Sequence, residues 1–214
     1  MIKKNLYIIG IGDHARVVFS EVRKLKNFIF KGFINKISAN SKIFNLDKNS
    51  KYKDLNRIKN VKSLVLKNFF VVAVGDNKTR KKIVKEYEKK FINVKWATII
   101  SKNANIEKNV KIGEGSMIIS GSTINIGSRI GKHTIINTNC SIDHDNKIYD
   151  YVNCSPGITS AGNVTIKDQV FVGLGSSIKQ NVIIDKNVTV GAHSYVNKDC
   201  RANFTYYGVP IKKR

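Results

Sequence analysis

The sequence predicts two domains of different fold class, an α/β domain followed by an all-β domain. In residues 1–96, strand-like and helix-like runs alternate, which predicts a Rossmann-like βαβ domain. In residues 97–203, a six-residue repeat predicts a parallel β-helix. A glycine-rich loop at residues 10–15 (Gly-x-Gly-x-x-Ala) lies between the first strand and the first helix, as in nucleotide-binding folds. Residues 204–214 are expected to form a C-terminal tail.

The N-terminal elements follow from short hydrophobic runs and from the amphipathic stretches between them. We expect strands at residues 6–10, 28–34 and 69–75, helices at residues 15–25 and 77–90, a loop over residues 38–54 and a short helix at residues 55–58. The alternation of strands and helices predicts a small parallel sheet.

The repeat consists of seventeen hexads that begin at Ile100 and continue without insertion through the hexad of Val196. The first position is aliphatic except at Cys154 and Ser160, and the fifth is small or β-branched except at Asn146. One aliphatic and one small inward residue per hexad describe a short strand and a corner. Three such faces close a coil of about 18 residues, and stacked coils bury a continuous interior.

Composition and charge limit the class of protein. With 42% hydrophobic residues the chain can bury a core, and no apolar run approaches the length of a membrane span. The N-terminus lacks the apolar region of a signal peptide, so we expect a cytoplasmic protein. Cys140, Cys154 and Cys200 all fall at inward hexad positions, which predicts buried thiols rather than disulfides or nucleophiles.

The formal net charge is +23, and residues 1–99 carry 24 Lys and Arg against 7 Asp and Glu. The lysines are scattered among asparagines without a nucleic-acid-binding motif. We therefore interpret the charge as a solvated basic surface, compatible with a field that attracts anionic nucleotide substrates. Binding to nucleic acid remains an alternative, and we expect neither a nucleic-acid partner nor a membrane span.

The exceptions to the hexad pattern cluster in residues 141–163, around Asp143-His144-Asp145. Histidine can take and return a proton near neutral pH, and a neighbouring carboxylate can orient its ring. One coil later, Gly162 aligns with His144, so we expect the missing side chain to leave room for a thin ligand such as a pantetheine arm. His133 and His193 have no acidic neighbour and are expected on the surface.

The glycine loop is also typical of nicotinamide enzymes, which use an acidic residue about 20 residues later to hold the ribose. The second predicted strand ends in Phe33-Ile34-Asn35-Lys36, without an acid. We therefore expect no NAD, and infer that the loop approaches another phosphate-bearing ligand at a helix N-terminus. A non-catalytic β-helix scaffold also remains an alternative.

Four motifs, in this order, resemble the NeuD/PglD-like sugar acyltransferase family: GIGDHARVV (10–18), AVGDNKTRKKI (73–83), the DHD…SAGNVTI run (143–166) and GVP (208–210). The resemblance implies a left-handed β-helix, a homotrimer with active sites between subunits, an N-terminal domain that binds a nucleotide-linked amino sugar and a β-helix that binds acetyl-CoA. It implies no metal.

The resemblance also implies roles for individual residues. His144 matches the catalytic base and Asp145 its acidic partner. The residues expected to bind the nucleotide-linked sugar are Gly10, Gly12, Asp13, His14, Asn35, Lys36, Gly75, Asp76 and Asn77. Those expected to bind acetyl-CoA are Asn153, Ser160, Ala161, Gly162, Gly173, Gly191, Ala192, Val209 and Pro210. Asp13 stands where the family has glycine, and Asn153 where many members have histidine.

The expected activity is acetyl-CoA-dependent N-acetylation of an amino group, at C4 of a UDP- or GDP-linked amino-deoxy sugar, for surface polysaccharide or glycan synthesis. O-acetylation of a sialic- or legionaminic-type acid is the main alternative, because the same histidine chemistry serves an oxygen acceptor. An NAD-dependent oxidoreductase is a remote alternative.

Overall fold

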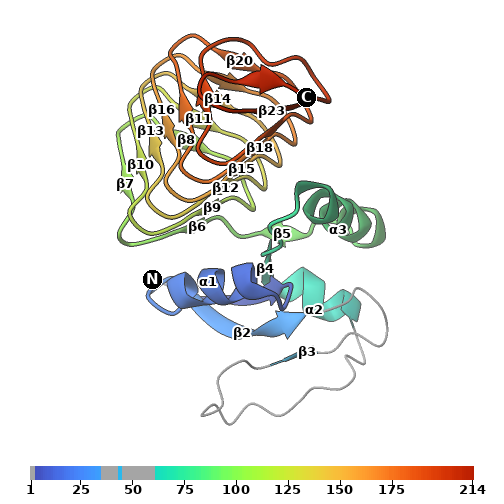
Figure 1. Ribbon diagram of the computed structural model, residues 1–214. Helices are drawn as coiled ribbons and strands as arrows, with labels where there is room; N and C mark the ends of the chain where they lie inside the picture. The colour runs from blue at the N-terminus through green and yellow to red at the C-terminus, as the bar shows by residue number, and fades with distance from the viewer. Residues whose placement is uncertain (1–2, 35–42, 45–60) are drawn as a thin grey trace. The chain divides into compact units, whose positions relative to one another are not determined.

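The computed structural model describes residues 3–34, 43–44 and 61–214, and the predicted loop over residues 38–54 and helix at residues 55–58 lie mostly or wholly outside them. The chain divides into two compact units, residues 1–99 and residues 100–214 (Figure 1). No helix in the described ranges is long and apolar enough to cross a membrane.

The first unit contains a five-stranded sheet in the order β3-β2-β1-β4-β5, parallel except for β3, which runs antiparallel to β2. Its elements are β1 (Lys4–Ile9), α1 (Asp13–Val22), β2 (Phe28–Ile34), β3 (Ile43–Phe44), α2 (Val61–Lys67), β4 (Phe69–Val72), α3 (Asn77–Lys90) and β5 (Lys95–Trp96). The order of β2, β1 and β4 confirms the predicted Rossmann-like arrangement, in which the first strand lies centrally. Helix α2 and strand β5 were not predicted.

Aromatic side chains pack the two long helices onto opposite faces of this sheet. Phe19 of α1 contacts Phe33, with ring centroids 5.4 Å apart, whereas Tyr87 of α3 contacts Phe70 at 6.0 Å. Phe33 pairs with Ile8, and Phe70 pairs with Tyr7. Because neighbouring residues of β1 face opposite sides, the two helices cover opposite faces. The loops that lead into α1 and α3 follow the carboxyl ends of β1 and β4.

The second unit is a parallel β-helix of three sheets, in the orders β22-β19-β16-β13-β10-β7, β20-β17-β14-β11-β8 and β24-β23-β21-β18-β15-β12-β9-β6 (Figure 1). Its strands are β6 (Ile99–Ile100), β7 (Asn105–Ile106), β8 (Lys111–Ile112), β9 (Met117–Ile118), β10 (Thr123–Ile124), β11 (Arg129–Ile130), β12 (Ile135–Ile136), β13 (Ser141–Ile142), β14 (Lys147–Ile148), β15 (Asn153–Cys154), β16 (Thr159–Ser160), β17 (Thr165–Ile166), β18 (Phe171–Val172), β19 (Ser177–Ile178), β20 (Ile183–Ile184), β21 (Thr189–Val190), β22 (Tyr195–Val196), β23 (Thr205–Tyr207) and β24 (Lys212–Lys213).

The hexad pattern accounts for the interior and for the corners of this unit. First-position residues such as Ile124, Ile142 and Val190 are fully buried in one continuous core. The fourth residue has a positive φ in fifteen consecutive hexads, from Asn109 to His193. Ten of these residues are Asn or Gly, which adopt the left-handed conformation at least cost. Five of the thirteen asparagines in residues 100–214 stand at this corner position.

Candidate active site

His144 lies in the corner between β13 and β14, which we call the His144 corner (residues 143–146). Its ring Nδ1 is 2.9 Å from Oδ2 of Asp145, and about half of each side chain is exposed. Asp145 adopts a left-handed φ of 57°, the conformation that the fourth position has in fifteen hexads, and its carboxylate faces the ring. With Nδ1–H donating to this carboxylate, Nε2 is left as the proton acceptor.

The two carboxylates beside His144 have different roles. Asp143 Oδ1 accepts hydrogen bonds from the His144 backbone N–H at 2.8 Å and from Asn125 Nδ2 at 3.0 Å, and these bonds hold the pKa of Asp143 below its ordinary value. Asp145 instead bonds the ring and raises the pKa of His144, with the charge of Asp143 adding a smaller effect. The geometry therefore favours Asp145 as the residue that orients the base.

Gly162 provides space for the histidine ring itself. A Cβ atom added to Gly162 would lie 2.5 Å from His144 Nε2 and would also overlap Cε1. The His144 ring lies over this gap, and the expectation that a pantetheine arm passes here stays a prediction. The missing side chain allows the ring to lie flat against the next coil.

Asn146 holds the His144 corner from inside the prism. It is fully buried, and its Nδ2 donates to the carbonyl oxygens of Asp143 at 2.7 Å and of Ala161, in the next coil, at 3.0 Å. The Ala161 N–H donates to Ile178 O at 2.9 Å, so Ala161 has no backbone donor to offer a ligand. Ser160 is buried, and its Oγ has no hydrogen-bond partner among the described residues.

The other residues predicted to bind acetyl-CoA lie elsewhere on the prism. Gly173 and Gly191 follow β18 and β21 of the eight-stranded sheet. We call the corner after these strands (residues 173–176 and 191–194) the Gly173 corner. A Cβ on Gly173 would lie 2.5 Å from the Ala192 backbone nitrogen, so these segments stack closely. The Gly208 N–H donates to Ser194 Oγ at 3.1 Å, which brings the segment containing Val209 and Pro210 to the same corner. Asn153 is buried on β15 of that sheet.

In the first unit, Gly10 follows β1 and Gly12 precedes α1. Gly10 has a φ of +116°, and an added Cβ would lie 2.9 Å from Ala73 O, whereas nothing lies within 4 Å of a Cβ on Gly12. Asp13 is exposed, and its Oδ1 lies 3.5 Å from Nη1 of Arg16. Burial, aided by the charge of Arg80, lowers the pKa of His14 to about 4, so this ring is neutral at neutral pH.

The loop after β4 depends on Arg80, which the sequence reasoning missed. This arginine is fully buried and donates to Val74 O at 2.8 Å, Gly75 O at 3.0 Å and Asn77 Oδ1 at 2.7 Å. Asp76 caps α3 by accepting the Thr79 N–H at 2.8 Å. Asp76 and Asn77 therefore have local structural roles. Asn35 and Lys36 lie outside the described residues.

The structure corrects the prediction for His133, which is buried rather than exposed. Its ring stacks on Tyr151 with a centroid separation of 5.4 Å, beneath the glycine at position 115. His193 is exposed, as expected. The three cysteines are free and buried, as predicted. The described ranges contain no group of three or more His, Cys, Asp or Glu side chains that could hold a metal ion.

A Rossmann-like unit followed in the chain by stacked parallel coils is the architecture of the left-handed β-helix acyltransferases. Residues 5–87 match the PglD N-terminal domain family. The acetyltransferase domain of PglB from Neisseria gonorrhoeae FA1090, solved with acetyl coenzyme A, is 25% identical, with a TM-score of 0.85 over 99% of this chain and 100% of that one. The chain therefore resembles the NeuD/PglD-like family over residues 5–87, and the predicted fold is confirmed.

Two further proteins connected with perosamine by their names or bound ligands are also similar. PerB from Caulobacter crescentus, solved with CoA and GDP-perosamine, is 25% identical, with a TM-score of 0.79 over 98% of this chain and 97% of that one. GDP-perosamine N-acetyltransferase of Escherichia coli O157:H7 is 32% identical over 122 residues, or 57% of this chain. The matched part of the chain spans about half (54%) of the length of this curated relative.

Proposed function

We propose that this protein is an acetyl-CoA-dependent N-acetyltransferase that acts on the amino group, at C4, of a UDP- or GDP-linked amino-deoxy sugar. The observation that carries the proposal is the His144–Asp145 pair, whose Nδ1···Oδ2 contact of 2.9 Å leaves Nε2 as a base. The names of the relatives support an amino-sugar acceptor and favour GDP as the nucleotide.

The reaction requires one proton acceptor and no redox step. The sugar amine attacks the thioester carbonyl carbon, a C–N bond forms, and His144 Nε2 takes the proton that the nitrogen loses. When the tetrahedral intermediate collapses, the C–S bond breaks and the imidazolium returns the proton to the thiolate leaving group. Asp145 stabilises the imidazolium and holds the ring in the reactive tautomer. The products are the sugar acetamide and free CoA.

Binding roles are part of the same proposal. We assign the nucleotide-linked sugar to Gly10, Gly12, Asp13, His14, Asn35, Lys36, Gly75, Asp76 and Asn77, and acetyl-CoA to Asn153, Ser160, Ala161, Gly162, Gly173, Gly191, Ala192, Val209 and Pro210. The open approach to Gly12 and the neutral His14 ring support a ligand at the first loop. Acetyl-CoA, available in the cytoplasm, supports a cytoplasmic location.

A homotrimer completes the proposed site. The residues assigned to acetyl-CoA fall at two different corners of the prism, which one subunit does not bring together. In a threefold assembly, the Gly173 corner of one subunit faces the His144 corner of the next. Leu174 and Val209, exposed by 49% and 74%, supply apolar surface at the Gly173 corner. Light scattering should give about three times the mass of one chain.

The direct test is release of CoA thiol from acetyl-CoA with a panel of UDP-, GDP- and CMP-linked sugars. Turnover with a 4-amino sugar and a base-stable product supports N-acetylation, whereas a product that hydroxylamine cleaves identifies an O-acetyl ester. Absence of turnover with every acceptor contradicts the proposal and favours the alternative of a non-catalytic β-helix scaffold. Titration with NADH tests the oxidoreductase alternative in the same preparation.

We predict that His144→Ala lowers kcat by at least about a hundredfold, the usual contribution of a general base, with little change in substrate Kd. His193→Ala is the matched control. Its ring lies over Gly175 as that of His144 lies over Gly162, but the residue after it is serine rather than aspartate. Near-normal turnover by the His144 variant removes this residue from the mechanism.

A further inference from the structure

We propose that the outer face of β8, β11 and β14 holds a subsite for a phosphate or diphosphate group, formed by Arg129 and Lys147 with Lys111 at its end. The identity of the ligand rests on the proposed function, because both substrates of that reaction carry phosphates. None of these three residues is among those predicted to bind either substrate.

The first observation is a column of like charges. Arg129 of β11 is paired in register with Lys111 on one side and with Lys147 on the other. All three side chains point outward, and none forms an ion pair with any residue in the described ranges. Like charges directly opposite one another on neighbouring strands are destabilising. An anion bound across them offsets this repulsion.

Neighbouring columns show the opposite arrangement. Lys132 pairs with Glu114 at 2.9 Å, and Lys167 pairs with Asp185 at 3.3 Å, each across one 18-residue coil. In those columns the sequence stacks a cation on an anion. The column of Lys111, Arg129 and Lys147 therefore departs from a charge pattern that the same β-helix follows elsewhere.

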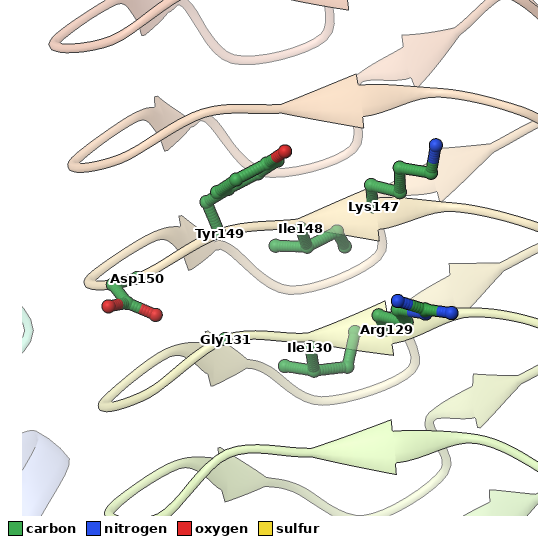
Figure 2. Close-up of a pocket in the computed structure, with 7 residues that line it drawn as sticks. All are labelled: Arg129, Ile130, Gly131, Lys147, Ile148, Tyr149 and Asp150. Atoms are coloured by element: carbon green, nitrogen blue, oxygen red, sulfur yellow. The ribbon is translucent and has the colours of Figure 1, made fainter.

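The second observation is hollowed surface on both sides of Arg129 and Lys147. Two cavities of about 370 Å³ each share these two residues. One is lined further by Ile130, Ile148, Tyr149 and Asp150, and Figure 2 shows the Arg129 and Lys147 side chains extending beside each other from adjacent coils. The other is lined by Gly127, Asp145, Asn163 and Thr165. We call these two cavities together the cleft. It reaches Asp145, the partner of the proposed catalytic base.

The two carboxylates that line the cleft are already engaged. Asp145 bonds the His144 ring, and Asp150 Oδ1 accepts the Lys132 backbone N–H at 2.7 Å. Neither carboxylate forms an ion pair with Arg129 or Lys147 in the described residues, so both side chains can bind an external anion. A guanidinium binds two phosphate oxygens at once, and an ammonium adds a point charge beside it. This chemistry suits the diphosphate of a nucleotide-linked sugar or the phosphates of CoA.

The test compares the full-length wild type with the double variant Arg129→Gln/Lys147→Gln. Calorimetric titrations at low salt use GDP, UDP, CoA and inorganic pyrophosphate. Lys102→Gln/Lys186→Gln is the control, since it also removes two exposed positive charges but lines neither cavity. We expect the cleft variant to lose at least about tenfold in affinity for one class of ligand, and the control to stay within about twofold. Thermal unfolding of all three proteins shows whether the fold is retained.

The ligand that loses affinity identifies the source of the phosphate. Weaker GDP or UDP binding with unchanged CoA binding assigns the cleft to the nucleotide-linked sugar, and the converse assigns it to CoA. Equal losses in both double variants, unchanged affinities in the cleft variant, or no phosphate binding by the wild type overturns the proposal. A phosphate-binding cleft in a protein without thiol release instead contradicts the proposed function alone.

Discussion

At the scale of single residues, the chemistry of the site depends on the direction in which two aspartates point. Asp143 is occupied by the His144 backbone and by Asn125, whereas the left-handed conformation of Asp145 directs its carboxylate to the ring. The imidazolium is therefore stabilised mainly by Asp145, which raises the pKa of His144. A base must be neutral to accept a proton, so this pKa sets the lower pH limit of activity.

We predict that kcat/KM rises with pH as His144 loses its proton, with a midpoint above the ordinary histidine pKa. Asp145→Asn removes the negative charge that favours the imidazolium. The midpoint should therefore move to lower pH, while the plateau falls because the ring is less well held. Asp143→Asn should shift the midpoint in the same direction by less. A pH–rate profile that Asp145→Asn leaves unchanged contradicts this role for Asp145.

The sequence could identify His144 but not the details of its surroundings. The Asp-His-Asp run interrupts a strict repeat, and this interruption is visible without a structure. The choice between the two aspartates depends on backbone dihedral angles, and the space over Gly162 is filled because the ring folds onto the next coil. The sequence also did not indicate that Arg80 is buried, because an arginine in a lysine-rich helix is ordinarily expected to face solvent.

At the scale of elements, the corner between β13 and β14 is anchored by a buried amide. Fifth-position side chains elsewhere are small or β-branched, but Asn146 is a buried amide that reaches the next coil through Ala161 O. Ser128 Oγ supports the same corner by donating to Asp143 O at 2.8 Å. The polar exception to the hexad pattern thus ties the backbone that carries His144 to the rest of the β-helix.

We predict that Asn146→Ala lowers the free energy of unfolding by about 1–3 kcal/mol, because buried carbonyl groups lose their donor. Turnover should fall as well, since His144 is then held less firmly. Asn105→Ala, at an exposed strand position, is the control and should change stability by less than about 0.5 kcal/mol. Urea unfolding of both variants measures the difference, and equal stabilities contradict the anchoring role.

The boundaries of helices and strands could be predicted where the hydrophobic repeat is strict. They were predicted less well where the repeat is weak or absent. The hexads place strands β6 to β22 because an inward residue, nearly always aliphatic, recurs every six residues, and α3 has the predicted bounds of residues 77–90. Strands β23 and β24 lie in residues 204–214, which were predicted only as a tail. Helix α2 (residues 61–67) and strand β5 (residues 95–96) are too short to show a period, and tertiary packing decides them. The predicted strand at residues 69–75 ends at residue 72, where the loop fixed by Arg80 follows.

At the scale of the whole molecule, the positive charge is distributed unevenly between the two units. The first 99 residues hold most of the excess of Lys and Arg over Asp and Glu, and they include the loop proposed to meet the nucleotide. A basic surface attracts polyphosphate ligands over distances comparable with the Debye length. We therefore expect the charge to act on substrate capture rather than on the chemical step at His144.

We predict that KM for the nucleotide-linked sugar rises several-fold between about 20 and 200 mM salt, while kcat changes little, because ions screen the attraction but not the bound geometry. The free 4-amino sugar, which lacks the diphosphate, is the control, and its KM should not rise with salt. Steady-state thiol release measures both acceptors. If KM for the nucleotide-linked sugar does not respond to salt, the charge is a solvated surface without a role in capture. Duplex DNA that still inhibits at physiological salt would instead favour the nucleic-acid alternative.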